Sequence, residues 1–203
     1  MPTLYHAPMS RSTSILALVH ELGDPEDLEI VRVTIPRADG SEGPDPRNPH
    51  PEKKVPVLVD EGELIRERGA IIVWLTERYP SALAPLAGQK NRGTFLKWLF
   101  WYQGVFEPVV IFDHIKLDDP IVNATFRDLP TAIGQIEDAL AGGDYLLGDS
   151  YSAADLLIAG AFGWFRHLIP ETGPIGSWVE RCQGREAARR AMAEDGAERG
   201  GPA

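Results

Sequence analysis

The stretch Val55-Pro56-Val57-Leu58-Val59-Asp60, followed at Glu67-Arg68-Gly69-Ala70-Ile71 by the start of a helix, decides the fold of this chain. A proline that opens a Val-rich strand removes one hydrogen-bond donor from the sheet and keeps the preceding residue extended. The backbone of Val55 can therefore pair with a short peptide laid alongside it, as in strand addition. The N–H groups at the start of the following helix favour a carboxylate. Together these features predict a site for a small, anionic, peptide-like ligand.

Around this stretch, the first eighty residues alternate between strand and helix patterns. Ile15, Leu18, Val19 and Leu22 follow the spacing of one helix face, and Gly23 is a typical helix end. The predicted elements, in chain order, are a strand at 3–6, a helix at 12–22, a strand at 28–33, a loop at 34–53, a hairpin at 57–65 and a helix that ends at 79. This order predicts a small α/β unit with a mixed sheet.

Beyond Pro85 the strand signals vanish, and apolar residues recur only at helical spacing. One helix carries a run of aromatic residues, and Pro108 is expected to kink or end it. Further helices are predicted around 133–140 and after Ser152-Ala153-Ala154-Asp155, whose residue types suit a capping box. The last residues, 186–203, have the composition of a frayed end.

The predicted domains are therefore residues 1–80, a linker at 81–87, and an all-helical domain at 88–203 with a frayed tail. Their composition, with 43% hydrophobic and 25% charged residues in a chain of 203, is that of a soluble globular protein. The net charge of −10, with no basic half or stripe, argues against a nucleic-acid partner.

The sequence also predicts the compartment. No apolar run approaches the ~20 residues that span a membrane, and residues 1–5 lack the features of a signal peptide. The only cysteine, Cys182, fits a reducing compartment and excludes a Cys-x-x-Cys redox centre. We therefore expect a cytoplasmic protein without a membrane partner. No metal is expected either, because the five histidines show no ligand spacing.

Several short motifs occur in a fixed order over most of the chain. They are Leu4-Tyr5 through Ser10-Arg11-Ser12, Glu21-Leu22-Gly23, Asn48-Pro49, Lys54-Val55-Pro56-Val57-Leu58, Glu67 with Ala70-Ile71, Arg78-Tyr79-Pro80, Tyr145-Leu146-Leu147-Gly148-Asp149 and Ser152-Ala153-Ala154-Asp155. In order and spacing they resemble the cytosolic glutathione transferases, and in particular the bacterial theta-like type that uses a serine. The resemblance implies an α/β thioredoxin-like N-terminal domain followed by an all-α C-terminal domain. It also implies glutathione as co-substrate and a homodimer.

The resemblance assigns roles to residues around the Val-Pro stretch. Pro56 would be the family's cis-proline, and Val55 would pair its backbone with the cysteinyl part of glutathione. Glu67 would meet the γ-glutamyl ammonium. The loop before Val55 is longer than the family's commonest form, so Lys53 and Lys54 compete for the glycyl carboxylate.

One residue departs from the family pattern. Arg68 stands where Ser or Thr is usual. Its guanidinium could bind the γ-glutamyl carboxylate as a bidentate pair, or it could point to solvent. The departure keeps open a rival reading, in which the fold serves as a non-catalytic ligand-binding or interaction protein. A glutathione-dependent isomerase, lyase or dehalogenase is a further alternative, although Ser10-Arg11-Ser12 does not match the Ser-Ser-Cys motif of the isomerase class.

The chemistry of glutathione transfer requires a thiolate, because a free thiol has a pKa near ~8.5 and is a poor nucleophile. A hydroxyl at the start of the first helix could stabilise that thiolate. Ser10 and Ser12 lie there, whereas Tyr5 lies within the predicted strand. Ser10 matches the catalytic position of the serine-using classes, and Arg11 could add positive potential. Both serines could instead be helix N-caps without a chemical role.

The second substrate would be a small apolar electrophile, held by the helical domain. Six aromatic residues fall within twelve positions: Phe95, Trp98, Phe100, Trp101, Tyr102 and Phe106. They cannot all share one helix face, so some belong to the core and others could line a binding wall. Trp101 and Val105 lie on a different face from Trp98 and Tyr102, so the sequence alone does not decide which members line the wall; Trp101 and Val105 are the candidates named for substrate contact.

Overall fold

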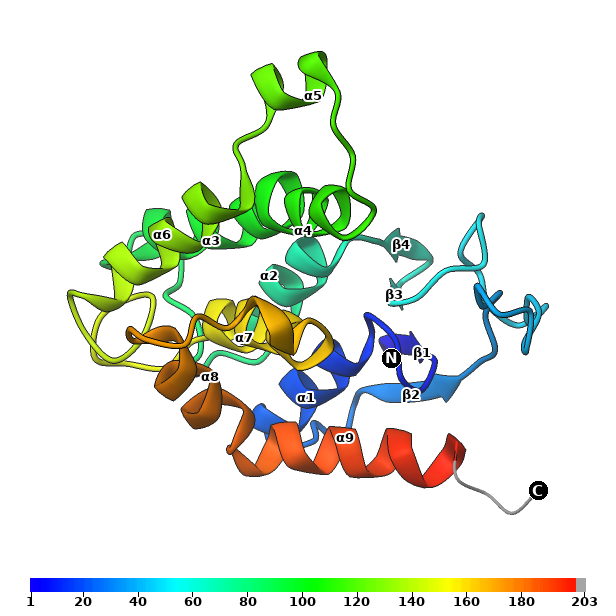
Figure 1. The fold of residues 1–203 in the computed structure, drawn as a ribbon. Coiled ribbons are helices and arrows are strands. Elements are labelled where there is room, and N and C mark those ends of the chain that lie inside the picture. Colours follow the sequence, from blue (N-terminus) through cyan, green and yellow to red (C-terminus); the bar gives the residue numbers. More distant parts are fainter. Residues whose placement is uncertain (200–203) are drawn as a thin grey trace. The chain divides into compact units, whose positions relative to one another are not determined.

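Four short strands form one mixed sheet in the N-terminal part of the chain (Figure 1). They are β1 (Thr3–His6), β2 (Glu29–Arg32), β3 (Val57–Asp60) and β4 (Glu63–Ile65). The sheet order is β2-β1-β3-β4, with β1 parallel to β2 and antiparallel to β3. The predicted hairpin between β3 and β4 is confirmed, and it turns at Glu61 and Gly62, which both have positive φ. Gly62 suits this turn because glycine tolerates positive φ without steric cost.

The computed structural model describes residues 1–199, and the chain divides into two compact units. One unit joins Met1–Ser81 to the segment that begins at Gly184, and the other comprises Ala82–Gln183. The first unit holds the sheet with α1 (Thr13–Glu21), α2 (Arg68–Arg78) and α9 (Glu186–Arg199). This arrangement of a sheet-containing unit and a helical unit confirms the predicted fold class.

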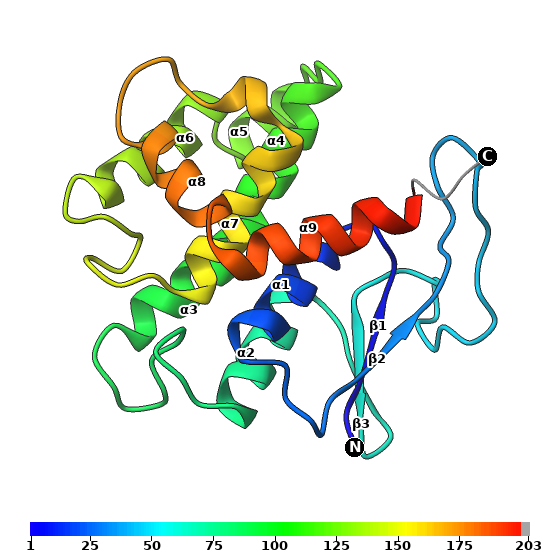
Figure 2. The ribbon, with the colours of Figure 1, turned by 90° about the horizontal axis from the view of Figure 1, so that it is seen from below.

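The helix α9 corrects the prediction of a frayed end that belongs to the helical domain. Residues 186–199 are helical and group with the N-terminal unit, where α9 packs along α1 (Figure 2). Ala187, Ala191 and Asp195 are buried on one face of α9. Small alanine side chains allow two helices to approach closely, but they give only a weak apolar pattern in the sequence. Residues 200–203 lie outside the described part of the chain.

The second unit consists of helices. They are α3 (Arg92–Trp101), a π-helical turn η1 (Tyr102–Phe106), α4 (Glu107–His114), α5 (Pro120–Thr125), α6 (Leu129–Leu140), α7 (Ala153–Trp164), a 3-10 turn η2 (Arg166–Leu168) and α8 (Ile175–Gln183). The helix α7 forms the centre of this unit and is buried along most of its length. The predicted capping box at its start is confirmed: the Asp155 carboxylate accepts the Ser152 N–H at 2.9 Å.

Pro108 neither ends nor breaks the aromatic helix. The chain runs from α3 through the π turn into α4, and Pro108 occupies the first turn of α4. Proline has no N–H to donate to the preceding turn, and π-helical segments occur mostly as single turns inside α-helices, as here. Of the two alternatives expected for Pro108, a kink or an end of the helix, the end is wrong, because the chain continues as α4 to His114.

Candidate active site

A turn between β1 and α1 begins a chain of hydrogen-bonded side chains that runs into the interior of the sheet-containing unit. Ser10 Oγ lies 2.8 Å from Ser12 Oγ, and Ser12 Oγ lies 2.8 Å from His6 Nδ1. His6 Nε2 in turn lies 2.9 Å from Asp195 Oδ1 on α9. His6 and Ser12 are 0% exposed and Asp195 is 1% exposed, whereas Ser10 is only partly buried. Ser10 is therefore the outer end of a buried polar chain.

The turn is built by local hydrogen bonds of its own serines. The Ser12 hydroxyl oxygen accepts the Ala7 N–H at 3.1 Å, and the Ser10 hydroxyl donates to the Ala7 carbonyl at 2.7 Å. The Ser12 N–H also donates to Ser10 Oγ at 3.1 Å. Ser12 occupies the N-cap position of α1, but its side chain makes no capping hydrogen bond to the helix. The hydroxyl of Ser12 thus serves the polar chain and not the helix start.

Asp195 fixes the far end of this chain and the turn together. Besides His6, its carboxylate accepts the Met9 N–H at 2.8 Å and the Thr13 hydroxyl at 2.5 Å. Burial acts to raise the pKa of the Asp195 carboxyl, but the hydrogen bonds from His6, Thr13 and Met9 outweigh it and hold the pKa below its usual value. Asp195 is therefore a carboxylate at neutral pH. Neither His6 nor Asp195 was among the predicted site residues.

The Val55–Pro56 peptide bond is cis, which confirms the prediction for Pro56. Val55 packs in one buried cluster with Ala7 and Val33. Ala7 directly follows β1, so this cluster holds the predicted peptide-binding stretch against the residues that lead into the Ser10 turn. Ala7 thus links the two regions, because it packs with Val55 and its carbonyl accepts the Ser10 hydroxyl.

The two competing lysines differ in their surroundings. The Lys53 ammonium donates to the Asn48 carbonyl at 2.6 Å, so it is turned onto the backbone of its own loop. The Lys54 side chain is 70% exposed and pairs at 2.9 Å with Glu52, which is itself 61% exposed. An exposed pair of this kind is weak and can open for a ligand. Lys54 is therefore the more accessible of the two cations.

The start of α2 places Glu67 and Arg68 in different environments. Glu67 is exposed at the N-cap position with a φ of 68°, whereas the Arg68 residue is only 7% exposed. This corrects the alternative in which Arg68 points to solvent. Burial, and next the charge of Arg66, lower the pKa of His50, while Glu67 acts in the opposite sense. His50 lies in the loop before Val55, so this loop and the start of α2 are within electrostatic range.

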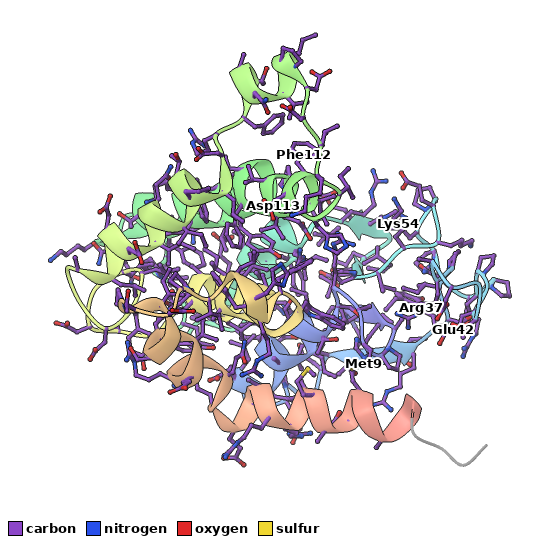
Figure 3. All side chains as sticks on the ribbon, viewed as in Figure 1. Met9, Arg37, Glu42, Lys54, Phe112 and Asp113 are labelled. Carbon is purple, nitrogen blue, oxygen red and sulfur yellow. The ribbon has the colours of Figure 1, made fainter. Side chains whose placement is uncertain are left out.

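Arg37 is a further residue that the sequence analysis missed. Its guanidinium donates to the Met9 carbonyl at 3.0 Å and to the Pro8 carbonyl at 2.7 Å, and it pairs with Glu42 at 3.0 Å (Figure 3). Arg37 follows β2 in a loop without regular structure, where no spacing signals a role. It holds the backbone of the turn just before Ser10. Arg11, by contrast, is exposed.

The two substrate candidates of the helical unit lie in and before its π turn. Trp101 is 8% exposed, and its ring stacks on Phe106 with 5.2 Å between the ring centroids. Val105 is partly buried, and Phe100 is the exposed member of the aromatic run at 75%. Packing within the core thus accounts for Trp101 without a ligand.

Residues 1–199 hold no group of three or more His, Cys, Asp or Glu side chains that could bind a metal ion. Within the same residues, no helix is long and apolar enough to cross a membrane. Cys182 is buried.

Comparisons with known proteins identify the family. The model of the glutathione S-transferase N-terminal domain matches residues 4–85, and that of the C-terminal domain matches residues 119–194. Glutathione S-transferase F10 of Arabidopsis thaliana is 26% identical, over 71% of this chain and 75% of its own length. The disulfide-bond oxidoreductase YfcG of Escherichia coli is also 26% identical, over 95% of this chain and 94% of its own.

A solved structure extends this likeness to the fold. A glutathione transferase from Methylococcus capsulatus superposes with a TM-score of 0.72 and 28% sequence identity, and the match covers 97% of this chain and all of that one. The family models together match most of the present sequence, one in each region that the motifs indicated. The chain therefore belongs to the glutathione transferase family.

Proposed function

We propose that this protein binds glutathione on its sheet-containing unit, holds the thiolate with the Ser10 hydroxyl, and adds it to small apolar electrophiles. The observation that carries this proposal is the position of Ser10. It is the partly exposed end of a buried polar chain, and its hydroxyl donates to the carbonyl of Ala7, which packs in one buried cluster with Val55. A serine hydroxyl at a helix start beside a peptide-binding stretch suits a bound cysteinyl sulfur.

The remaining contacts to glutathione follow from charge and exposure. The Val55 backbone would pair with the cysteinyl residue, as an added strand does. Lys54 would reach the glycyl carboxylate, because Lys53 is engaged with the Asn48 carbonyl. The exposed Glu67 carboxylate would meet the γ-glutamyl ammonium. The buried Arg68 would act near the γ-glutamyl carboxylate, where a guanidinium can form two parallel hydrogen bonds.

The energy required of Ser10 is modest. Each unit by which the thiol pKa falls corresponds to ~1.4 kcal/mol. A hydrogen bond to a charged group contributes about 1.5–3 kcal/mol, and the positive end of α1 adds about 0.3–1 kcal/mol. One hydroxyl and one helix start can therefore lower a thiol pKa from ~8.5 to below neutral. This scheme requires no metal.

We also propose a homodimer, and this proposal rests on the family alone.

Disulfide reduction is a second candidate, favoured by the similarity to YfcG over nearly the whole chain. The only cysteine of this chain, Cys182, is buried in the helical unit. The reducing thiol would therefore be that of glutathione itself. The same Ser10 hydroxyl would then stabilise a thiolate that attacks a disulfide sulfur instead of a carbon electrophile.

The test combines binding, ionisation and turnover. Calorimetric titration with glutathione should show saturable heat, and ultraviolet difference spectra should show a thiolate at neutral pH. Turnover should then be compared between an activated aryl chloride and a small dialkyl disulfide. Faster turnover of the aryl chloride supports conjugation, and faster turnover of the disulfide supports the second candidate. A folded protein that takes up no glutathione would contradict both.

A further inference from the structure

The polar chain behind Ser10 ends on a charged pair, and the protons along it can be assigned. Asp195 is a buried carboxylate that accepts hydrogen bonds from Met9 and Thr13. An ionised carboxylate only accepts, so the hydrogen between Asp195 and His6 belongs to Nε2 of the imidazole. In a neutral imidazole the other nitrogen then carries no hydrogen and accepts one. His6 Nδ1 is therefore an acceptor that faces the Ser12 hydroxyl.

The two serines continue this order outward. Ser12 has a single hydroxyl proton, and its shorter contact, at 2.8 Å, is to His6 Nδ1, whereas the Ala7 carbonyl is 3.1 Å away. When Ser12 donates to His6, its oxygen can only accept from Ser10. The Ser10 proton has two acceptors within reach, the Ser12 oxygen at 2.8 Å and the Ala7 carbonyl at 2.7 Å. When the Ser10 hydroxyl turns its proton from the Ala7 carbonyl to Ser12, a continuous path for a proton runs from Ser10 inward to His6.

We propose that His6 accepts the proton of the glutathione thiol through the hydroxyls of Ser10 and Ser12, and that Asp195 stabilises the imidazolium that forms. This inference rests on the function proposed above, because it requires a thiol at Ser10. The S–H proton passes to Ser10 Oγ while the Ser10 proton passes to Ser12 Oγ and the Ser12 proton to His6 Nδ1. The electron pair of the S–H bond stays on sulfur. The products are a thiolate and an imidazolium, and no co-reactant is consumed.

After the transfer, every side chain between Ser10 and Asp195 in the hydrogen-bonded chain still has a hydrogen-bond partner. The His6 Nδ1–H now donates to Ser12, Ser12 donates to Ser10, and the Ser10 hydroxyl points its proton at the thiolate. The imidazolium forms 2.9 Å from the Asp195 carboxylate, so the new buried positive charge is paired from the start. Ser12 itself is 0% exposed, so it passes a proton but cannot attack a substrate.

The other charged groups around His6 lie on β2, on α1, on α9 and beside the turn that carries Ser10. Arg32 on β2 is the register partner of His6, and its guanidinium lies 3.5 Å from Glu194 of α9. His20 on α1 also faces Glu194, at 3.5 Å. Arg37 lies across the turn on the Met9 carbonyl. The Arg32 charge disfavours an imidazolium at His6, and the Glu194 charge favours it. Because these two charges have opposite effects, the Asp195 carboxylate, 2.9 Å from His6 Nε2, is the group that stabilises a proton on His6.

A proton count on the unaltered protein tests this inference. Glutathione is mixed with the protein in weakly buffered indicator solution at neutral pH, and thiolate absorbance and released protons are recorded together. S-methylglutathione, which has no ionisable thiol, provides the blank for proton changes caused by binding alone. With the relay, thiolate appears with far less than one proton released per thiolate. Release of one proton per thiolate would overturn the inference, because the proton would then have left the protein.

Two pairs of variants locate the proton acceptor. In His6→Gln and Asp195→Asn, we expect the thiol pKa to rise by about one unit, so that less thiolate is present at neutral pH. The thiolate that remains should release its proton to solvent. His20→Gln and Asp24→Asn are the matched controls, because this pair also joins a histidine to a carboxylate, at 2.6 Å, without a hydroxyl chain. The controls should retain both the thiolate and the low proton release.

The outcomes separate the relay from the function on which it rests. Absence of saturable glutathione binding, or of any thiolate, contradicts the proposed function. Binding and thiolate with full proton release contradict only the relay. An unchanged thiolate yield and unchanged proton release in folded His6→Gln would also contradict the relay. If both buried variants fail to fold, the proton count on the unaltered protein still decides.

Discussion

His6 Nε2 lies 2.9 Å from Asp195 Oδ1, although 189 positions separate the two residues in the chain. The contact joins the end of β1 to the last turns of α9. Through Met9 and Thr13, the same carboxylate also fixes the turn that carries Ser10. The helix α9 is therefore part of the structure that supports the candidate active site, and its contribution depends on the Asp195 carboxylate.

Asp195→Asn should destabilise the protein in a pH-dependent way. Hydrogen bonds to a charged group contribute about 1.5–3 kcal/mol, so a loss of this order in the free energy of unfolding is expected at pH 7. The pKa of Asp195 in the folded state lies below its unfolded value of about 3.9. Its stabilising contribution is therefore present above that value and is lost as the pH falls through the folded pKa. Urea unfolding at neutral and at acidic pH measures both quantities.

The unaltered protein and Asp195→Asn are compared with each other at each pH. The difference between the unaltered protein and Asp195→Asn should shrink as the pH falls below about 4. A difference that stays constant over this range would show that the substitution acts by packing and not through the charge of the carboxylate.

Ala191→Leu should destabilise the contact between α9 and α1. Ala191 is 0% exposed, and a larger side chain in a well-packed position typically costs about 1–3 kcal/mol. Met192→Ala is the matched control. Met192 is the next residue along the helix, but its side chain is 47% exposed, so truncating it should change the free energy of unfolding by less than about 0.5 kcal/mol. Thermal unfolding of both variants measures the difference. Equal stability of the two would mean that α9 does not dock on α1 in solution.

The sequence predicted the four strands, α1 and α2 of the sheet-containing unit closely, because their apolar periodicities are regular, but it did not predict α9. The strand at 3–6 matches β1 residue for residue, and the predicted helix at 12–22 contains α1. The capping box at Ser152 was also predicted, since it follows from a short local motif, whereas the cis bond at Pro56 was implied only by the family resemblance. Structural features that depend on residues close together in the sequence can thus be predicted from the sequence pattern.

The relay residues could not be predicted in this way. His6 lies inside a strand, where alternation explains its position without a partner. Asp195 lies in a polar, alanine-rich segment, and nothing local shows that one of its acidic residues is buried. The burial of Asp195 follows from the close approach of two helices through Ala187 and Ala191. Such a long-range contact between polar residues leaves no periodic signal in a single sequence.

Lys54→Ala should weaken glutathione binding by about threefold to fivefold, because an exposed ion pair contributes up to about 1 kcal/mol. The loss should diminish at high salt, as it does for other exposed charges. A glutathione ethyl ester at the glycyl carboxylate provides the matched ligand: it should bind Lys54→Ala and the unaltered protein equally well. Calorimetry with both ligands measures this coupling. A full effect of Lys54→Ala on the ester would place the glycyl carboxylate elsewhere.

Ser10→Ala should lower kcat by at least about tenfold while the Kd for glutathione changes little, because the hydroxyl acts on the charged form of the sulfur. Ser12→Ala should lower kcat in the same direction, since it interrupts the polar chain between Ser10 and His6. Ser14→Ala is the matched control. Its hydroxyl donates to the Arg11 carbonyl at 2.9 Å and takes no part in that chain. Steady-state kinetics with calorimetry on the three variants separates binding from turnover, and unchanged kcat in Ser10→Ala would exclude this hydroxyl as the thiolate donor.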